Sequence, residues 1–210
     1  MFPKERYTGK KMIQLIDHNP QMCAHWYSQF HNCKDVSIHC GDFFSLPTNC
    51  IVSPANSFGF MDGALDLAIS NKLGWHLQEK LQTQIRQKYL GEILVGQAEL
   101  IETGDSEIPF CISAPTMRVP AMLNETVNIY LAAKAIFHLV KNESRIRTVS
   151  ISGLGTGVGR VDPSISALQM KKAYDDIWLG KLTQPSSWID AQKEHQLLYR
   201  QEYKDLQFET

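Results

Sequence analysis

Two periodicities alternate along this sequence. Short apolar segments rich in Val, Ile and Cys have the length of buried β-strands, and the longer segments between them repeat their apolar residues with the 3.6-residue period of an α-helix. This alternation predicts an α/β protein, a three-layer α/β/α sandwich with a mixed central sheet. Strands are expected at residues 12–17, 35–39, 50–53, 92–102, 110–114 and 148–152. Helices are expected at 21–30, at 64–89 with an interruption near Gly74, at 124–142, from 163 onward and at 186–203.

Three of these helices are preceded by residues typical of a helix start. Asn19 precedes Pro20, and Asp162 precedes Pro163. A capping side chain followed by Pro in the first helical position is a common way for a helix to begin. Asn124 is expected to cap the helix that runs to residue 142, whose wide apolar face must pack on the sheet.

The charge of the chain excludes one class of function. Its 210 residues contain 21 Lys and Arg against 22 Asp and Glu, a formal net charge of −1. Proteins that bind nucleic acids by bulk electrostatics need an excess of basic residues, which this balance does not provide. No apolar run approaches the roughly 18 residues of a membrane-spanning helix. Five cysteines without regular pairing favour a reducing compartment, so the sequence predicts a cytoplasmic protein that binds no membrane.

Four glycines in seven residues follow the expected strand 148–152, at positions 153, 155, 157 and 159. Glycine permits a positive φ and a close approach of the backbone to a ligand, so consecutive N–H groups can converge on an anion. Thr156 adds a hydroxyl group to this loop. The loop lacks both the Lys-Ser/Thr of a Walker motif and the spacing of the dinucleotide fingerprint. A tight turn between strand and helix remains the alternative interpretation.

A second unusual loop, residues 55–63, follows the expected strand 50–53. Asn56 provides a polar amide directly after a buried strand, and Gly63 precedes a helix whose first N–H groups are unpaired and favour a phosphate. Asp62 and Asp66 lie at the start of that helix, where the helix dipole also stabilises an acidic residue. Asp62 is therefore interpreted as a helix cap, whereas for Asp66 the structural and the functional interpretation both stay open.

A third loop begins with Gly41 and Asp42 at the end of the expected strand 35–39. A carboxylate there can accept hydrogen bonds from the exocyclic amine of a purine or from ribose hydroxyls, although Gly-Asp is also a common turn. Ligands of α/β sheets bind beyond the carboxyl ends of the strands. The three loops are therefore expected to form one site.

In this order, the three loops resemble those of the macrodomain family, whose members bind ADP-ribose and in some cases hydrolyse ADP-ribosyl linkages. The resemblance is carried by residues 41–43, 51–57, 63–66 and 153–159, and it includes the ten-residue spacing from Asn56 to Asp66. It implies a macrodomain-like, ADP-ribose-binding domain over residues 1–180 and a C-terminal helical extension over residues 181–210.

The resemblance also implies roles for individual residues. Asn56 and Asp66 match the positions that hold the distal ribose and activate water in the hydrolytic members. Asp42 matches the position that binds the adenine amine, beside which Phe43 would lie. The ligand-binding positions implied are Asp42, Phe43, Ser53, Asn56, Gly63, Gly153, Gly155, Thr156, Gly157 and Val158. Neither a metal nor a cofactor is implied, and the expected partner is ADP-ribose or an ADP-ribosylated macromolecule.

Three segments depart from the usual pattern of the family. Ser53 stands where Asn is usual, residues 58–62 replace a run of glycines, and Gly159-Arg160 stands where an aromatic residue often follows. These departures leave nucleotide binding as the expectation. They favour a non-catalytic reader of ADP-ribose as the alternative to a hydrolase.

Unrelated functions receive less support from the sequence. Acidic strand ends at Asp17 and Asp42 resemble those of adenosylmethionine-dependent methyltransferases, but the glycine-rich turn that those enzymes need after the first strand is missing. Three His/Cys pairs lie close together in the sequence without a common zinc spacing: Cys23/His25, His31/Cys33 and His39/Cys40.

Two further groups of residues are interpreted structurally. Cys50 and Cys111 fall within apolar strands, where a thiol is normally inert packing. Arg118 would meet a phosphate only if it lay at the same sheet edge, and it is interpreted as a solvated surface residue.

Overall fold

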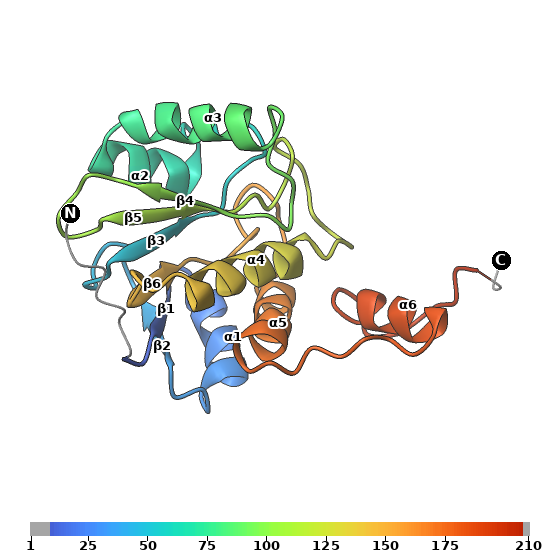
Figure 1. Cartoon of the computed structure of the whole chain (residues 1–210). Helices are drawn as coiled ribbons and strands as arrows, with labels where there is room; N and C mark the ends of the chain where they lie inside the picture. The colour runs from blue at the N-terminus through green and yellow to red at the C-terminus, as the bar shows by residue number, and fades with distance from the viewer. Residues whose placement is uncertain (1–8, 208–210) are drawn as a thin grey trace.

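A six-stranded sheet lies between two layers of helices in the computed structural model, which describes residues 9–207 (Figure 1). The first eight and the last three residues of the two expected domains therefore lie outside the described residues. The strands are β1 (Met12–Asp17), β2 (Val36–Cys40), β3 (Cys50–Ser53), β4 (Glu99–Glu102), β5 (Phe110–Ser113) and β6 (Thr148–Ile151). Their order in the sheet is β2-β1-β6-β3-β5-β4, and every pairing is parallel except that of β4 with β5. The predicted α/β sandwich with a mixed sheet is confirmed.

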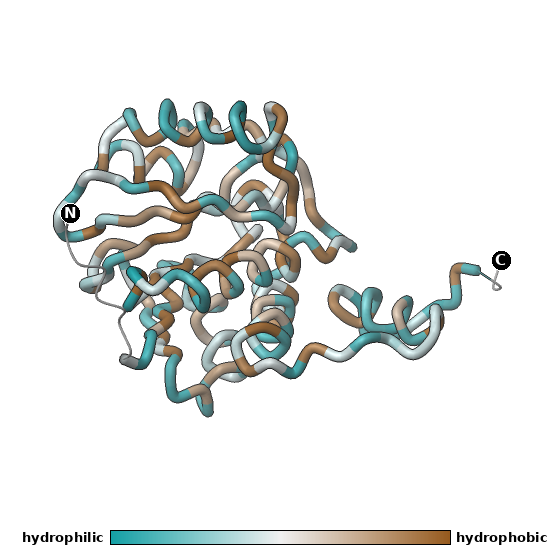
Figure 2. Tube along the Cα trace, viewed as in Figure 1, coloured by the Kyte–Doolittle hydropathy of each residue, from teal (hydrophilic) through white to brown (hydrophobic). Residues whose placement is uncertain are grey.

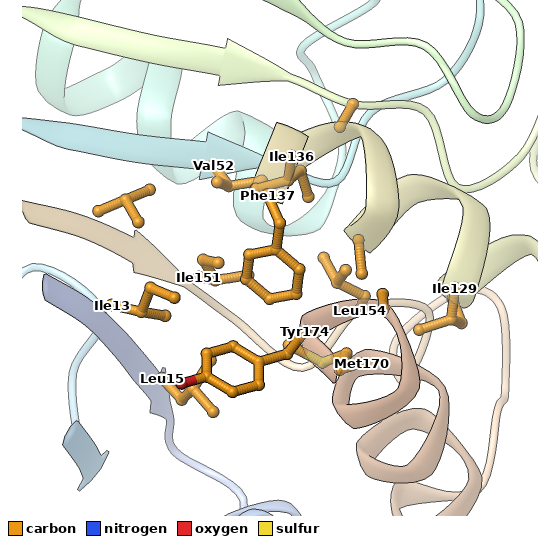
Figure 3. Close-up of a cluster of buried hydrophobic side chains, with 14 of the residues drawn as sticks. Ile13, Leu15, Val52, Ile129, Ile136, Phe137, Ile151, Leu154, Met170 and Tyr174 are labelled. Atoms are coloured by element: carbon orange, nitrogen blue, oxygen red, sulfur yellow. The ribbon is translucent and has the colours of Figure 1, made fainter. Parts of the chain in front are cut away.

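Each helix layer covers one face of this sheet. The helices are α1 (Pro20–Phe30), α2 (Ala64–Leu73), α3 (His76–Lys88), α4 (Asn128–Asn142), α5 (Pro163–Ala173), the π-helical turn η1 (Tyr174–Trp178) and α6 (Trp188–Gln196). Helices α1, α4 and α5 bury a large apolar cluster against one face, in which Phe137 and Tyr174 lie between the helices and β1 (Figure 3). Helices α2 and α3 bury a second cluster against the other face. Hydrophobic positions accordingly concentrate in the strands (Figure 2).

The predicted signals of helix starts and of a helix interruption are confirmed. The side chain of Asn19 accepts the N–H of Gln21 at 2.9 Å, and that of Asp162 accepts the N–H of Ser164 at 2.8 Å. Gly74 separates α2 from α3 with a φ of 103°, which is accessible to glycine at no steric cost.

The strand expected at residues 92–102 is wrong in its first part. Only Glu99–Glu102 pairs in the sheet. Gly91 and Gly96 have φ values of 100° and 95°, and the N–H of Ile93 binds the carbonyl of Ser57 at 2.9 Å. Residues 92–98 therefore follow the loop after β3 instead of extending the edge strand.

Two expected helix starts are also wrong. Asn124 does not cap α4, which begins at Asn128, because Glu125 has a φ of 60° that a continuous helix excludes. Asp62 does not cap α2 either, since Gly63 occupies the capping position without a side-chain hydrogen bond.

The C-terminal helix is shorter than the expected 186–203. It begins after Ser187, whose hydroxyl accepts the N–H of Asp190 at 3.1 Å, and ends at Gln196. In Figure 1 it lies to one side of the three layers. It is joined to them by a hydrogen bond from Nε2 of Gln169 to the carbonyl of Leu198 (3.1 Å) and by the ion pair of Arg200 with Glu125 (3.0 Å).

Candidate functional site

The principal cleft lies at the carboxyl ends of the parallel strands and has a volume of about 680 Å³. This volume is within the range of pockets that hold small molecules, roughly 300–1,000 Å³. The residues that line it are 16–19, 41–44, 54–56, 60, 62–66, 68, 116–117, 120, 152–153 and 155–159. The three loops singled out by the sequence therefore meet in one cleft, as predicted. Their predicted residues that line it are Asp42, Phe43, Asn56, Gly63, Asp66, Gly153, Gly155, Thr156, Gly157 and Val158.

The glycine loop after β6 presents backbone N–H groups to this cleft. Gly155 has a φ of 73°, and a Cβ at this position would lie 2.3 Å from Cδ1 of Ile129, so the backbone path requires glycine. The Thr156 hydroxyl donates to the carbonyl of Gly153 at 2.9 Å, which fixes the turn. Within residues 9–207, the N–H groups of Gly155, Gly157 and Val158 donate to no protein acceptor. They are available to an anion.

The start of α2 supplies a second set of donors to the same cleft. The first backbone bond of the helix runs from the N–H of Leu67 to the carbonyl of Gly63 at 3.2 Å. Among the described residues, the N–H groups of Gly63, Ala64 and Leu65 have no acceptor, as is usual for a helix N-terminus. Ala64 has a φ of 47°, a strained conformation for a residue with a Cβ. A helix N-terminus and the glycine loop thus both offer donors suited to a diphosphate.

Asp66, in the first turn of α2, is the buried carboxylate of the cleft. Its side chain is only 8% exposed, and Oδ1 accepts the hydroxyl of Ser53 at 2.5 Å. Burial raises the pKa of Asp66 to about 6, against the lowering effect of the Ser53 hydrogen bond, and the nearby charge of Asp62 raises it further. At neutral pH the group is therefore mostly ionised, yet close enough to its pKa to accept a proton.

Ser53 is placed differently from the other predicted site residues. It is fully buried at the end of β3 and is not part of the lining of the cleft. Its one side-chain contact with the site is the hydrogen bond to Asp66. A direct contact of Ser53 with a ligand stays a prediction from the resemblance, whereas its contact with Asp66 was not foreseen.

Asn56 lines the cleft, but its side chain is engaged by its own loop. Nδ2 donates to the carbonyl of Phe60 at 2.7 Å, and Oδ1 accepts the N–H groups of Phe58 and Phe60 at 3.1 and 3.2 Å. These bonds shape residues 56–60, and a ribose hydroxyl would have to share them or replace one. The catalytic role of Asn56 stays a prediction.

The loop after β2 forms another part of the lining. Asp42 is exposed and its Oδ1 accepts the N–H of Phe44 at 2.8 Å. Phe43 is 9% exposed and packs edge to face with Phe44, with ring centroids 5.3 Å apart. Phe43 thus belongs mainly to the core beneath the loop, and Phe44 is an additional aromatic residue of the lining that the sequence interpretation missed.

Asp17, at the end of β1, is the second residue that sequence reasoning missed at this site. Its Oδ2 accepts the N–H of Gly153 at 2.9 Å, and its Oδ1 accepts the N–H of Asn19 at 2.9 Å. One carboxylate therefore joins the start of the glycine loop to the start of α1. An acidic residue at a strand end is the sequence signal for this role.

The remaining candidate residues lie outside the cleft. Arg118 is exposed, pairs with Glu92 at 2.6 Å and stacks over the ring of Phe58, which confirms the surface interpretation. Cys50 and Cys111 are fully buried, as predicted, and burial raises the pKa of both thiols. All five cysteines are free thiols. The described part of the chain contains no cluster of three His, Cys, Asp or Glu side chains arranged to hold a metal. None of its helices is long and apolar enough to span a membrane.

The fold and the cleft define a class of protein: an α/β domain whose cleft places backbone N–H groups suited to an anion beside one buried carboxylate. A sequence model of the Macro domain family matches residues 52–170, more than half of the chain. The chain belongs to the macrodomain family. This assignment replaces the methyltransferase alternative.

One relative is similar to this chain in sequence. An uncharacterized protein of Aquifex aeolicus (strain VF5) is 32% identical over 136 residues, which cover 65% of this chain and 78% of that protein.

Solved structures share the fold at lower identity. The macrodomain of Mycobacterium tuberculosis DarG has a TM-score of 0.54 at 21% identity, over 65% of this chain and 87% of that one. A variant of the Oceanobacillus iheyensis macrodomain with ADPR has a TM-score of 0.57 at 21% identity, and the match covers 69% of this chain and 77% of that one. Thermosipho africanus DarTG in complex with ADP-ribose has a TM-score of 0.54 at 17% identity, and the match covers 80% of this chain and 50% of that one.

Proposed function

We propose that this protein binds ADP-ribose in the cleft between the glycine loop and α2 and hydrolyses the linkage between ADP-ribose and a modified macromolecule. The observation that carries the proposal is the presence of a buried, mostly ionised carboxylate, Asp66, in the same cleft as two sets of unpaired backbone donors. Membership of the macrodomain family and the ADP-ribose bound to similar structures support it.

The diphosphate is the part of the ligand best matched by the cleft. The N–H groups of Gly63–Leu65 and those of Gly155, Gly157 and Val158 donate to its oxygens. The formal net charge of −1 is therefore no obstacle to binding an anion. The carboxylate of Asp42 accepts a hydrogen bond from the exocyclic amine of the adenine, as the resemblance implies. Asn56 binds the hydroxyls of the distal ribose.

Asp66 acts on the water that attacks the anomeric carbon of the distal ribose. As the water oxygen bonds to this carbon, the bond from the carbon to the acceptor breaks, and the electron pair leaves with the acceptor. The carboxylate of Asp66 orients the water and accepts its proton, while positive charge develops on the ribose ring as in glycoside hydrolysis. No metal takes part in this scheme.

Binding is tested by calorimetric titration with ADP-ribose. Wild-type protein is expected to bind, and Asp42→Ala is expected to weaken binding about tenfold because a charge-assisted hydrogen bond to the base is lost. A flat titration with wild-type protein at millimolar ADP-ribose would contradict the proposal.

Hydrolysis is tested with a panel of mono-ADP-ribosylated proteins and nucleic acids. Release of free ADP-ribose by wild-type protein is expected, with a loss of at least about a hundredfold in Asp66→Ala. Asp66→Ala should still bind ADP-ribose, because the backbone donors remain in place.

A second function, a non-catalytic reader of ADP-ribose, is favoured by one specific observation. The side chain of Asn56 makes three hydrogen bonds within its own loop, which competes with binding of the distal ribose. Binding without release across the whole panel would establish the reader.

A further inference from the structure

Two serines occupy equivalent positions at the ends of neighbouring strands. Ser53 ends β3 and Ser113 ends β5, and the two are partners in the parallel register. Both side chains are fully buried. Partners in parallel strands point to the same side of the sheet. Ile51 and Cys111, two residues earlier on each strand, belong to the cluster under α2 and α3. Both hydroxyls therefore face the layer that carries Asp66.

Only one of these hydroxyls has a partner. The Oγ of Ser53 donates to Oδ1 of Asp66 at 2.5 Å, in the distance range of a hydroxyl bonded to a carboxylate. The Oγ of Ser113 is buried without a hydrogen-bond partner within the described chain. Because position, burial and residue type are the same, Ser113 is a matched control for Ser53.

The bond fixes one half of a carboxylate that borders the cleft. Asp66 lines the cleft although it is 8% exposed. Its Oδ1 is occupied by Ser53, and among the described groups Oδ2 accepts no hydrogen bond. A carboxylate held by one oxygen has a defined orientation, which leaves the other oxygen to accept from a water in the cleft.

We propose that Ser53 is a positioning residue that orients the Asp66 carboxylate toward the cleft and stabilises its charged form. The proposal deepens the proposed hydrolytic function and rests on it for its catalytic consequence. The hydrogen bond between Ser53 and Asp66, and its effect on the carboxylate, can be tested without any enzymatic activity. Ser53 thus replaces the Asn usual at this position with a residue that acts through Asp66.

The other titratable groups that act on Asp66 are few. Asp62, from the loop before α2, adds a like charge that raises the pKa of Asp66. Cys111, from β5, is fully buried, and its thiol stays neutral because burial raises its pKa. Since neither group is altered in the variants below, a change in the titration of Asp66 reports on the Ser53 hydroxyl.

The first test measures the titration of Asp66 by NMR of the ¹³C-labelled carboxyl group, assigned by comparison with Asp66→Asn. Ser53→Ala is expected to raise the pKa of Asp66 by about one unit, because a hydroxyl bonded to the charged form is lost. Ser53→Thr, which keeps the hydroxyl, should restore the wild-type value. Ser113→Ala should leave it unchanged.

The second test measures hydrolysis by the same variants as a function of pH. In Ser53→Ala the acidic limb of the kcat profile should move to higher pH by the same interval as the pKa. At a pH above the acidic limbs of both wild type and Ser53→Ala, a loss of about tenfold in kcat should persist in the variant, because the carboxylate is no longer oriented. KM and the Kd for ADP-ribose should stay within about twofold of wild type, since Ser53 is not part of the lining of the cleft and the backbone donors are unchanged.

Defined outcomes overturn the proposal. An unchanged or lowered pKa of Asp66 in Ser53→Ala would contradict it, as would an equal shift in Ser113→Ala, which would show an effect of packing alone. If Ser53→Ala does not fold, Ser53→Cys replaces it, and its weaker donor should give a smaller upward shift. Absence of hydrolysis by wild-type protein would refute the proposed enzymatic function, while the NMR titration would still decide the role of Ser53.

Discussion

Asp66 shows how a single residue combines two opposing effects. Burial in the first turn of α2 disfavours its charge, and the Ser53 hydroxyl favours it, with a resulting pKa of about 6 against 3.8 for an ordinary Asp. Between about pH 4 and pH 6 the folded state keeps a proton that the unfolded chain has released, so the charge of Asp66 costs stability over this interval, and the full cost is present at neutral pH. The site thus retains a charge that costs stability, as is common at functional positions.

Asp66→Asn is therefore predicted to change the pH dependence of stability. In wild type, Asp66 disfavours folding increasingly as the pH rises from about 4 to about 6. The free energy of unfolding of Asp66→Asn relative to wild type should accordingly rise by up to about 3 kcal/mol over this interval. Urea unfolding of both proteins between pH 4 and pH 7 measures it. A difference that stays constant with pH would contradict the pKa assigned to Asp66.

Ala64 is a second residue of the cleft whose conformation lowers the stability of the fold. Its φ of 47° lies in the left-handed region, so Ala64→Gly should stabilise the protein by about 1 kcal/mol. Ala68→Gly, a change on the same helix within its regular part, should destabilise by about 1 kcal/mol. Chemical denaturation of the two variants checks the prediction, and equal effects of both substitutions would refute the strain at Ala64.

At the scale of elements, the cleft is formed by connections and the helices and strands place them. The glycine loop starts at the N–H of Gly153, held by Asp17 of β1, and its far end is held by the N–H of Leu123, which donates to the carbonyl of Gly159 at 2.8 Å. Both ends of the loop are thus bound to separate parts of the chain. The N–H groups between them are held in place before any ligand binds, which reduces the entropy lost on binding.

Two glycines of this loop are predicted to respond differently to the same substitution. Gly155→Ala should destabilise the protein by about 3 kcal/mol, because the new Cβ collides with Ile129 at a positive φ. Gly157→Ala should change stability by less than about 0.5 kcal/mol, since nothing lies within 4 Å of its Cβ.

The second substitution should instead affect the ligand. The added methyl group of Gly157→Ala lies in the loop that lines the cleft, so the affinity for ADP-ribose should fall about tenfold or more because the backbone can no longer approach the diphosphate closely. Thermal unfolding and calorimetric titration separate the two effects. Loss of stability in Gly157→Ala with unchanged affinity would contradict the role assigned to this loop.

For the whole molecule, the cleft and the C-terminal extension are separate. The cleft is lined by residues up to Gly159, whereas the extension contacts the sandwich through Gln169 and Glu125. The exposed apolar side chains of the extension, such as Trp188 and Ile189, are not part of the lining of the cleft. The division of the chain near residue 180 stays a proposal.

A chain that ends at Gly180 is predicted to retain the binding site. Its Kd for ADP-ribose should stay within about threefold of the full-length value, because the removed residues touch none of the lining. Its melting temperature should fall slightly, since the bonds of Leu198 and Arg200 to the sandwich are lost. Calorimetric titration measures the affinity, and a loss of binding in a folded truncated chain would assign the extension to the site.

Several features of the fold were predictable because they depend on neighbouring residues. The limits of β1 and β3, the starts of α1 and α5, and the interruption at Gly74 follow from periodicity, capping side chains and glycine, all of which act within a few positions. The site loops were predictable for the same reason, since a glycine-rich segment after a strand permits backbone conformations and close approaches that other residues do not.

Other features required the folded chain because distant residues decide them. Residues 92–98 do not form a strand, and the N–H of Ile93 instead bonds to the carbonyl of Ser57. Helix α4 starts later than expected because Glu125 adopts a positive φ. Asp17 reaches the glycine loop 136 positions away, and Ser53 reaches Asp66 on a different element.

Local sequence alone specified an α/β chain with three ligand loops, since strand period, caps and glycines are short-range properties, and the resemblance to the macrodomain family added two candidate catalytic residues. Tertiary structure decided which of those residues share one cleft, which hydroxyl lies behind the carboxylate, and how strongly burial disfavours its charge. Burial, hydrogen bonding across the sheet and the resulting pKa depend on what surrounds a side chain in space, and those surroundings come from parts of the chain far apart in sequence.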